Sequence, residues 1–401
     1  MNNGMVGPPL NSSRSTEPHR ASGREVLLLT SLFPVRSAPN RGVFIDHRIS
    51  ALAASGEKAT VVDLGYSVLG VRRGSARVRP LPLGIDVLRF TPGIPSWQWR
   101  HLRRGDVTAA MVARYARQLA RQLDRSRYRL IHAHGMFGIP AGAVARELSR
   151  ILRIPYMVTF HGSDVNVLMP QQPELFTATI TESAASIFVS KALQERAESL
   201  GHLPTGNLHV IPNGIDPAIF HSKGRPEEIP LHLLYVGNLN PLKGADRLPE
   251  IWELIRAEHP AASLTVLGGG PLHTRLQSAM KGTGTMFRGT VEPPAVAEAM
   301  RSAFLVLLPS RSEGWPTVIL ESYACGTPVI AADVGGSREA VGMFARTVSE
   351  GPSFEQRFAR ACLDMVASPP SPTDLARHAQ QFTWAALHRA EADVYARITE
   401  D

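Results

Sequence analysis

The chain has 401 residues, of which 44% are hydrophobic, and a formal net charge of +8, which fits a globular protein large enough for two domains. No apolar run approaches the roughly 18 residues that indicate a bilayer-spanning helix, so the sequence predicts no transmembrane segment. The two cysteines, Cys325 and Cys362, are too few for a disulfide framework or a four-thiolate zinc site, and this favours the reducing cytoplasm.

The first half of the chain combines a polar tail with alternating strand and helix patterns. Residues 1–23 are rich in Asn, Ser, Gly and Pro without an apolar core, which predicts a disordered tail rather than a signal peptide. Short apolar runs predict strands at 26–31, 58–64, 130–134, 156–160 and 186–190. Segments between them, such as 106–125 and 142–150, predict helices. This alternation is typical of a parallel sheet covered by helices.

Positive charge is concentrated in the same half. The first 200 residues carry 26 Lys and Arg against 14 Asp and Glu, whereas the remainder carries 17 against 21. In the segment 97–105, "WQWRHLRRG", two tryptophans stand beside Arg100, Arg103 and Arg104. One interpretation is an interfacial membrane anchor. The alternatives are a solvated basic helix with tryptophans in the core, or a nucleic-acid surface, although no nucleic-acid-binding motif accompanies the charge.

A break in the pattern divides the chain into two domains. "VIPNGIDPAIF", at 210–220, contains the turn signals Asn-Gly and Asp-Pro and predicts a hinge near 212–216. The strand pattern then restarts at 231–236, 264–268, 285–288, 304–308 and 329–332. We therefore expect two Rossmann-like domains, 24–212 and 213–380, that face a central cleft. A last segment, 381–401, is expected to carry a helix at 383–398 that crosses back to the first domain.

The glycine pattern of the chain argues against a dinucleotide-binding enzyme, because the motif that such an enzyme needs is missing. No Gly-x-Gly-x-x-Gly follows the first strand, as a dinucleotide dehydrogenase would require. "VLGGGP", at 266–271, lies in the second half and is followed by proline, so it predicts a tight turn.

Two glutamates flank a predicted helix N-terminus between the strands at 304–308 and 329–332. Pro316 suits the first helical position, and Gly326 suits the helix end, so a helix is expected at 316–324. Helix N-termini attract phosphate, and carboxylates beside them suit hydroxyl groups on either side of phosphates. Glu313 and Glu321 therefore fit a sugar linked to a nucleoside diphosphate. The alternative is that Glu313 complements the helix dipole and Glu321 is solvated.

Seven motifs in order resemble the retaining glycosyltransferases of family 4, which have the two-domain GT-B fold. They are "PNRGVFIDHRISALAASG", "IHAHG", "TFHGSD", "VIPNGID", "YVGNLNPLKG", "LGGGP" and "SEGWPTVILESYACGTPVIA". The resemblance covers about 24–395. "TFHGSDVNV" and "YVGNLNPLKG" are most similar to the subgroup near teichuronic acid biosynthesis transferases, which build bacterial surface polysaccharide.

The resemblance implies a donor site in the second domain. Glu313 would hold hydroxyls of the donor sugar, Glu321 would hold the ribose hydroxyls, and Lys243 would neutralise the leaving phosphate. Backbone N–H groups around three neighbouring residues would face the diphosphate, namely Gly314, Trp315 and Thr317. The alternative for Lys243 is an exposed turn lysine.

Further donor contacts are implied around the second sheet. Phe287 and Arg288 would lie against the nucleobase, although a phenylalanine is more often a core residue. Many family members have arginine where this chain has Asn238, so the diphosphate site has one cation fewer. Compensation would come from one of the arginines at 288, 311 and 338.

In the first domain the resemblance implies contacts to the sugar and the acceptor. Gly42 would let the backbone approach the diphosphate, where a side chain would clash. His161 would sit beside the donor sugar and take part in catalysis. His134 and Asp164 are secondary candidates for the acceptor or the site, and a histidine at a strand end is more often structural.

These roles imply a sugar transfer with retention and without metal. No Asp-x-Asp pair occurs, so the metal site of the other large glycosyltransferase fold is absent. We expect no cofactor beyond a UDP- or GDP-type nucleotide sugar as co-substrate. The expected acceptor is a sugar or a lipid-linked sugar, on an anionic membrane surface inside the cell, with no nucleic acid involved.

Other functions remain open from the sequence alone. One is a sugar-nucleotide epimerase or phosphorylase on the same two-domain scaffold. A second is glycosylation of a soluble small molecule, and a third is a basic binding module without turnover.

Overall fold

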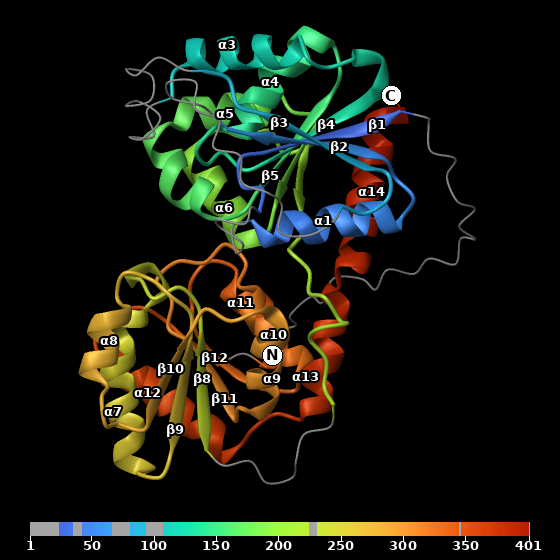
Figure 1. The fold of residues 1–401 in the computed structure, drawn as a ribbon. Coiled ribbons are helices and arrows are strands. Elements are labelled where there is room, and N and C mark those ends of the chain that lie inside the picture. The colour runs from blue at the N-terminus through green and yellow to red at the C-terminus, as the bar shows by residue number, and fades with distance from the viewer. Residues whose placement is uncertain are drawn as a thin grey trace, which may run out of the picture.

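The computed structural model describes residues 24–34, 42–65, 81–93, 107–223, 231–344 and 346–400. The expected tail at 1–23 and the basic segment at 97–105 lie outside these residues. Two α/β domains, one above the other in Figure 1, confirm the predicted fold class. No helix in the described ranges is both long enough and apolar enough to cross a membrane.

The first domain is built on a parallel sheet in the order β3-β2-β1-β4-β5-β6-β7. Its strands are β1 (Glu25–Thr30), β2 (Ala59–Leu64), β3 (Ile85–Phe90), β4 (Tyr128–His134), β5 (Tyr156–Phe160), β6 (Ala185–Phe188) and β7 (Leu208–Val210). Its described helices are α1 (Val43–Ala54), α3 (Ala109–Ala120), α4 (Ala141–Leu152), α5 (Pro173–Thr181) and α6 (Lys191–Leu200). Short helical turns lie at Arg125–Arg127, Asp164–Leu168 and Met169–Gln171.

The second domain has a parallel sheet in the order β10-β9-β8-β11-β12-β13. Its strands are β8 (His232–Val236), β9 (Ser263–Leu267), β10 (Thr285–Gly289), β11 (Leu305–Leu308), β12 (Val329–Ala332) and β13 (Thr347–Val348). The helices from here to the C-terminus are α7 (Leu248–Glu258), α8 (His273–Ala279), α9 (Pro293–Ser302), α10 (Thr317–Ala324), α11 (Ser337–Val341), α12 (Phe354–Ala367), α13 (Pro372–Ala379) and α14 (Trp384–Glu400). Short turns lie at Pro241–Lys243, Ala245–Arg247, Gly342–Phe344 and Gln380–Phe382.

Burial on both faces explains why the central strands are apolar throughout. In β1, Leu27 and Leu29 belong to the core shared with α3 and α4, whereas Val26 and Leu28 pack in a second core with α1 and α14. A strand covered by helices on both sides needs apolar residues at every position. All the predicted strands are confirmed to within two residues at each end, whereas β3, β7 and β13 were not predicted. The last two have only three and two residues, too few for a sequence pattern.

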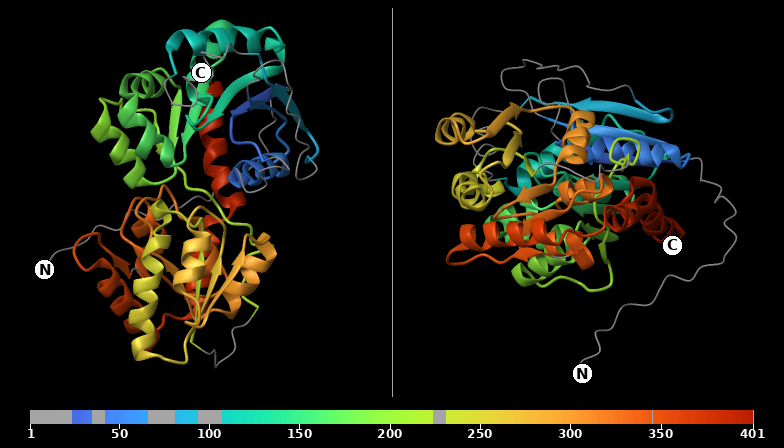
Figure 2. Two further views of the ribbon diagram at one scale, coloured as in Figure 1. Left: turned by 60° about the vertical axis from the view of Figure 1, so that its left-hand side comes forward. Right: turned by 90° about the horizontal axis from the view of Figure 1, so that it is seen from below.

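The chain crosses between the domains twice. The first crossing follows β7, and the second is α14, which leaves the second domain and packs on the first beside α1 and β4 (Figures 1 and 2). The two crossings touch, because the Ile215 N–H donates to the Phe382 carbonyl at 2.8 Å and the Trp384 N–H donates to the Ile215 carbonyl at 3.3 Å. The linker is therefore bonded to the start of α14.

A buried ion pair anchors α14 to the first domain. Arg48 of α1 donates to Glu391 of α14, and both side chains are about 5% exposed. Tyr395 also donates to Glu391, at 2.7 Å, and Nδ1 of His132 lies 3.2 Å from the same carboxylate. Burial alone would raise the pKa of Glu391, but the Arg48 charge and these hydrogen bonds together lower it well below its ordinary value.

We predict that Glu391→Ala destabilises the protein by roughly 3–5 kcal/mol, because it leaves the Arg48 guanidinium buried without its partner. Because the folded-state pKa of Glu391 is lowered, its contribution is present above about pH 4.5 and is lost as the pH falls toward the folded-state pKa. Urea unfolding between pH 3 and 7 measures both effects.

The matched control is Glu298→Ala, which removes an exposed partner of Arg301 and should cost far less stability than Glu391→Ala. Equal losses for the two variants would show that the Arg48–Glu391 pair does not anchor α14.

Candidate active site

A cavity of about 470 Å³ lies between the two domains. The first domain lines it with the N-terminus of α1 and the loop after β5, and the second with the loops after β8 and β11 and part of α10. The linker and the first residue of α14 complete the lining. The strand-end loops come from carboxyl ends, where ligands bind in open α/β sheets.

Glu313 lies in the loop after β11 and is held by two donors. The Lys243 ammonium donates to both carboxylate oxygens, at 2.8 and 2.7 Å. Ser310, which is fully buried, donates its hydroxyl to Glu313 Oε1 at 2.7 Å. The Glu313 side chain is only 6% exposed, whereas that of Lys243 is 34% exposed. The lysine is therefore the partner with access to a ligand.

Lys243 is presented by a short turn after β8. The Asn240 side chain accepts from the Lys243 N–H at 3.0 Å and so caps the turn. The Tyr235 hydroxyl, from within β8, donates to the Lys243 carbonyl at 3.2 Å. Because β8 and β11 are neighbours in the sheet, the lysine and the glutamate arrive at the same point.

The helix α10 begins beside this pair at Thr317, one residue later than the predicted start at Pro316. Pro316 occupies the N-cap position, and Gly326 with φ +80° follows the helix end. Glu321 also lines the cavity, and its burial raises its pKa to about 7 while a hydrogen bond from Thr317 opposes the rise. Trp315 is 8% exposed and donates its ring N–H to the Asn213 carbonyl of the linker at 3.0 Å.

The facing wall comes from the first domain. Gly42 precedes α1 with φ +59°, and a Cβ there would lie 1.8 Å from the Leu32 carbonyl oxygen, so internal packing alone already demands glycine. The His161 ring lies on the cavity wall, with its centroid 4.2 Å from that of Phe44. Burial holds the pKa of His161 well below its ordinary value, so the ring is neutral. Among the described residues its buried Nδ1 has no hydrogen-bond partner.

The domains touch at a seam beside the cavity. A Cβ on Gly314 would lie 2.3 Å from the His161 carbonyl oxygen, so the two backbones meet where no side chain fits. Ser190 donates its hydroxyl to the Gly314 carbonyl at 2.8 Å. The Glu339 carboxylate accepts from the first two N–H groups of α6, at 2.8 Å each. These contacts hold the loop that carries Glu313 against the first domain.

Many of the residues predicted from the sequence share this cavity. They are Gly42, His161, Lys243, Glu313, Gly314, Trp315, Thr317 and Glu321.

The other predicted site residues do not line the cavity. His134 lies behind His161, with its Nδ1 3.4 Å from His161 Nε2, and Asp164 is buried beneath the same loop. Asn238 and Arg288 are exposed on the second domain, and Phe287 packs against its core. Their roles at the nucleobase, phosphate or acceptor stay predictions.

The cationic charge of the cavity is confined to one side chain. Arg311 donates to both oxygens of Asp246, and Arg338 pairs with Asp333, so two of the three arginines expected to offset the missing charge near Asn238 are engaged elsewhere. The third, Arg288, does not line the cavity. Within the described ranges, Lys243 is the only Lys or Arg that lines the cavity.

Several cavity residues were not recognised from the sequence. Phe44 and His47 lie on α1, Asn213 lies in the linker, and Trp384 begins α14. Asn213 belongs to an Asn-Gly pair that gave only a turn signal, and Trp384 is remote in sequence from every motif. No group of three or more His, Cys, Asp or Glu with metal-binding geometry occurs in the part of the chain that the structure describes.

Two family models match the chain, one in each half. "Glycosyltransferase Family 4" matches residues 42–219, and "Glycosyl transferases group 1" matches residues 218–382. Among solved structures, sucrose-phosphate synthase from Thermosynechococcus elongatus aligns with a TM-score of 0.70 at 19% identity, covering 94% of this chain and 99% of that one. Anabaena HepE in complex with UDP aligns with a TM-score of 0.68 at 18% identity, covering 93% and 100%.

Curated relatives are similar along most of their length. The putative teichuronic acid biosynthesis glycosyltransferase TuaC of Bacillus subtilis (strain 168) is 31% identical over 338 residues, which are 78% of this chain and 82% of the relative. A D-inositol 3-phosphate glycosyltransferase of Arthrobacter sp. (strain FB24) is 30% identical over 76% of each chain. With these relatives and the two family models, the chain belongs to the glycosyltransferases of the GT-B fold, with a family 4 first half and a group 1 second half.

Proposed function

We propose that the protein is a retaining, metal-independent hexosyltransferase that moves a sugar from a nucleoside diphosphate to a hydroxyl acceptor. The observation that carries this proposal is the contact of Lys243 with both oxygens of Glu313 in the interdomain cavity. This contact places a cation, the Lys243 ammonium, within hydrogen-bonding distance of an anion, the Glu313 carboxylate, which can accept hydrogen bonds from hydroxyl groups. A sugar diphosphate needs that combination where its sugar meets its phosphates.

We propose one orientation for the donor in this cavity. Lys243 would turn from Glu313 to the diphosphate, Glu313 would then accept from sugar hydroxyls, and Glu321 would accept from the ribose. The N-terminus of α10 lies between the two glutamates and adds its partial positive charge. The UDP and UDP-glucose bound by Anabaena HepE support a UDP-type donor.

Transfer would proceed by attack on the face from which the diphosphate departs. The bond from the anomeric carbon to the phosphate oxygen breaks, the bond to the acceptor oxygen forms, and the leaving phosphate takes the hydroxyl proton. Lys243 and the N–H groups of α10 would stabilise the departing charge. The seam between Gly314 and His161 would help to exclude water, which otherwise hydrolyses the donor.

The acceptor is proposed to belong to bacterial surface polysaccharide or glycolipid. The teichuronic acid name of the 31% identical relative supports this class. The D-inositol 3-phosphate glycosyltransferases support the alternative, a soluble small-molecule acceptor.

A panel of UDP- and GDP-sugars tests the proposal through donor hydrolysis and thermal stabilisation. At least one sugar nucleotide should raise the melting temperature and be hydrolysed slowly. A protein that neither binds nor turns over any of them would overturn the proposal. Products that form without acceptor and keep the nucleotide attached would indicate an epimerase, and activation by inorganic phosphate would indicate a phosphorylase.

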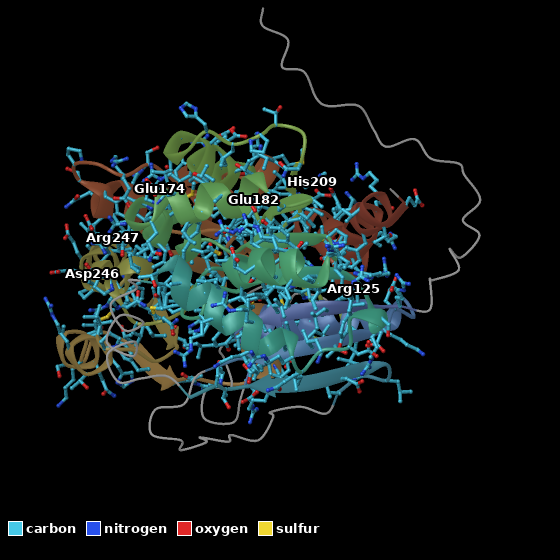
Figure 3. All side chains as sticks on the ribbon, turned by 90° about the horizontal axis from the view of Figure 1, so that it is seen from above. Arg125, Glu174, Glu182, His209, Asp246 and Arg247 are labelled. Carbon is cyan, nitrogen blue, oxygen red and sulfur yellow. The ribbon has the colours of Figure 1, made fainter. Side chains whose placement is uncertain are left out.

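The first domain also offers a basic face for an anionic membrane. Arg114, Arg117 and Arg121 are exposed on one side of α3, while Val112, Tyr115 and Leu119 are buried on the other. Figure 3 looks onto this end of the first domain, where Arg125 follows α3. Docking there would leave the second domain, which lies on the opposite side, free to move (Figure 1).

We predict different kinetic losses for the two glutamates. Glu313→Ala should mainly lower kcat, since Glu313 would touch the reacting sugar, whereas Glu321→Ala should mainly raise the donor KM. Each charge-assisted hydrogen bond is worth roughly 1.5–3 kcal/mol. Because the pKa of Glu321 is about 7, donor binding should tighten as the pH rises through 7 in the wild type and not in Glu321→Gln. Unchanged kinetics in Glu313→Ala would contradict its assignment.

Lys243 is predicted to supply the charge that other transferases obtain from a metal. Activity should survive EDTA, and Lys243→Ala should lose about two orders of magnitude in kcat. The control is Lys281→Ala, an exposed lysine of the same domain, which should behave as wild type. Loss of turnover in EDTA with recovery on adding Mg²⁺ would refute this role.

The membrane proposal predicts that changing Arg114, Arg117 and Arg121 to Gln weakens binding to phosphatidylserine vesicles. Each basic residue is worth about 1 kcal/mol at low salt, so the three together correspond to roughly a hundredfold loss. Donor hydrolysis should not change. The control triple, Arg275, Arg360 and Arg377 to Gln, lies on the second domain and should bind normally. No preference of the wild type for anionic over neutral vesicles would favour a soluble acceptor.

A further inference from the structure

Asp164 is a buried carboxylate that no cation neutralises among the described residues. It begins the helical turn that follows β5 and is 3% exposed. Buried carboxylates usually pair with Arg, Lys or a metal. Here three backbone N–H groups take that place.

Three backbone N–H groups donate to the two oxygens of the Asp164 carboxylate. Oδ1 accepts from Gly162 at 2.8 Å, from Val165 at 3.0 Å and from His161 at 3.1 Å, and Oδ2 accepts from His161 at 3.0 Å. Successive N–H groups that enclose one anion form a backbone nest. Burial raises the pKa of Asp164, and the N–H bonds oppose the rise. The loop is thus folded around its own side chain.

This arrangement sets the position of His161. Its N–H is fixed by Asp164, while its carbonyl meets Gly314 across the seam and its ring faces the cavity. The same loop extends to Asn166, whose amide lies 3.4 Å from the Ser312 hydroxyl and 3.5 Å from the Glu313 carbonyl. The carbonyl and the ring of His161 are the two groups that can reach a sugar. Their positions therefore depend on the Asp164 carboxylate, which lies outside the cavity.

We propose that Asp164 is a positioning residue for sugar transfer, whose carboxylate holds residues 161–165 so that His161 meets the donor sugar; this rests on the proposed function. Asp164 does not touch the donor, so its effect is confined to the sugar end. Under the proposed function the nucleoside diphosphate binds mainly to the second domain, so its affinity should change little.

The test compares wild type with Asp164→Asn in binding and turnover. The amide keeps the shape of the side chain, but one of its ends is a donor that would oppose the backbone N–H groups. Calorimetry with UDP and UDP-glucose, repeated with GDP and GDP-mannose, gives the affinity that the sugar adds to the nucleotide. Asp164→Asn should bind the nucleotide within about threefold of wild type and lose the added affinity of the sugar. The kcat of donor hydrolysis by Asp164→Asn should fall about ten- to a hundredfold, because a shift of about 1 Å at a reacting centre can cause such a loss.

Two further variants separate positioning from folding. Asp164→Ser keeps one acceptor oxygen and should recover part of kcat relative to Asp164→Ala. Asp374→Asn changes a partly exposed aspartate of the second domain and should match wild type. Equal weakening of nucleotide and nucleotide-sugar binding, or wild-type kcat in Asp164→Asn, would overturn the inference. A wild type that binds no nucleotide sugar would instead overturn the proposed function.

Discussion

The ion pair between Lys243 and Glu313 depends on the order of strands in the second sheet. β8 and β11 are neighbours although β9 and β10 separate them in the chain, so their loops open side by side. Connections leave this pair of strands toward opposite sides of the sheet, which opens a crevice between them. In the first sheet β1 and β4 make the same reversal, and Gly42 is the first described residue after the end of β1 and the short segment to residue 34. The two crevices face each other, and the cavity lies between them.

Close backbone contact, rather than side-chain interdigitation, joins the domains beside this pair. Gly162, Gly314 and Gly336 meet where added Cβ atoms would overlap neighbouring backbone. Bonds from Ser190 and to Glu339 cross the same seam. Each of these hydrogen bonds is worth only about 1 kcal/mol net.

The fold, and the position of two glutamates around a helix N-terminus, were predictable from local patterns. The strands are apolar because both sheet faces are buried, and Glu313 and Glu321 were recognisable because Pro316 and Gly326 mark the helix between them. What the sequence could not show is pairing across the fold. Nothing in "TFHGSD" says that Asp164 turns inward to its own backbone, and Arg311 offers no sign that Asp246 engages it. Trp384 could not be identified from the sequence, because it reaches the cavity only where α14 crosses back to the first domain.

The linker connects the ion pair that anchors α14 to the loop that carries Glu313. Asn213 accepts from Arg48 through its side chain at 3.4 Å and from Trp315 through its carbonyl at 3.0 Å. Arg48 is itself fixed by Glu391, and Trp315 stands two residues after Glu313. The linker is also bonded to the start of α14, so hydrogen bonds join the two crossings. Asn213 thereby joins the anchored end of α14 to the loop that carries Glu313.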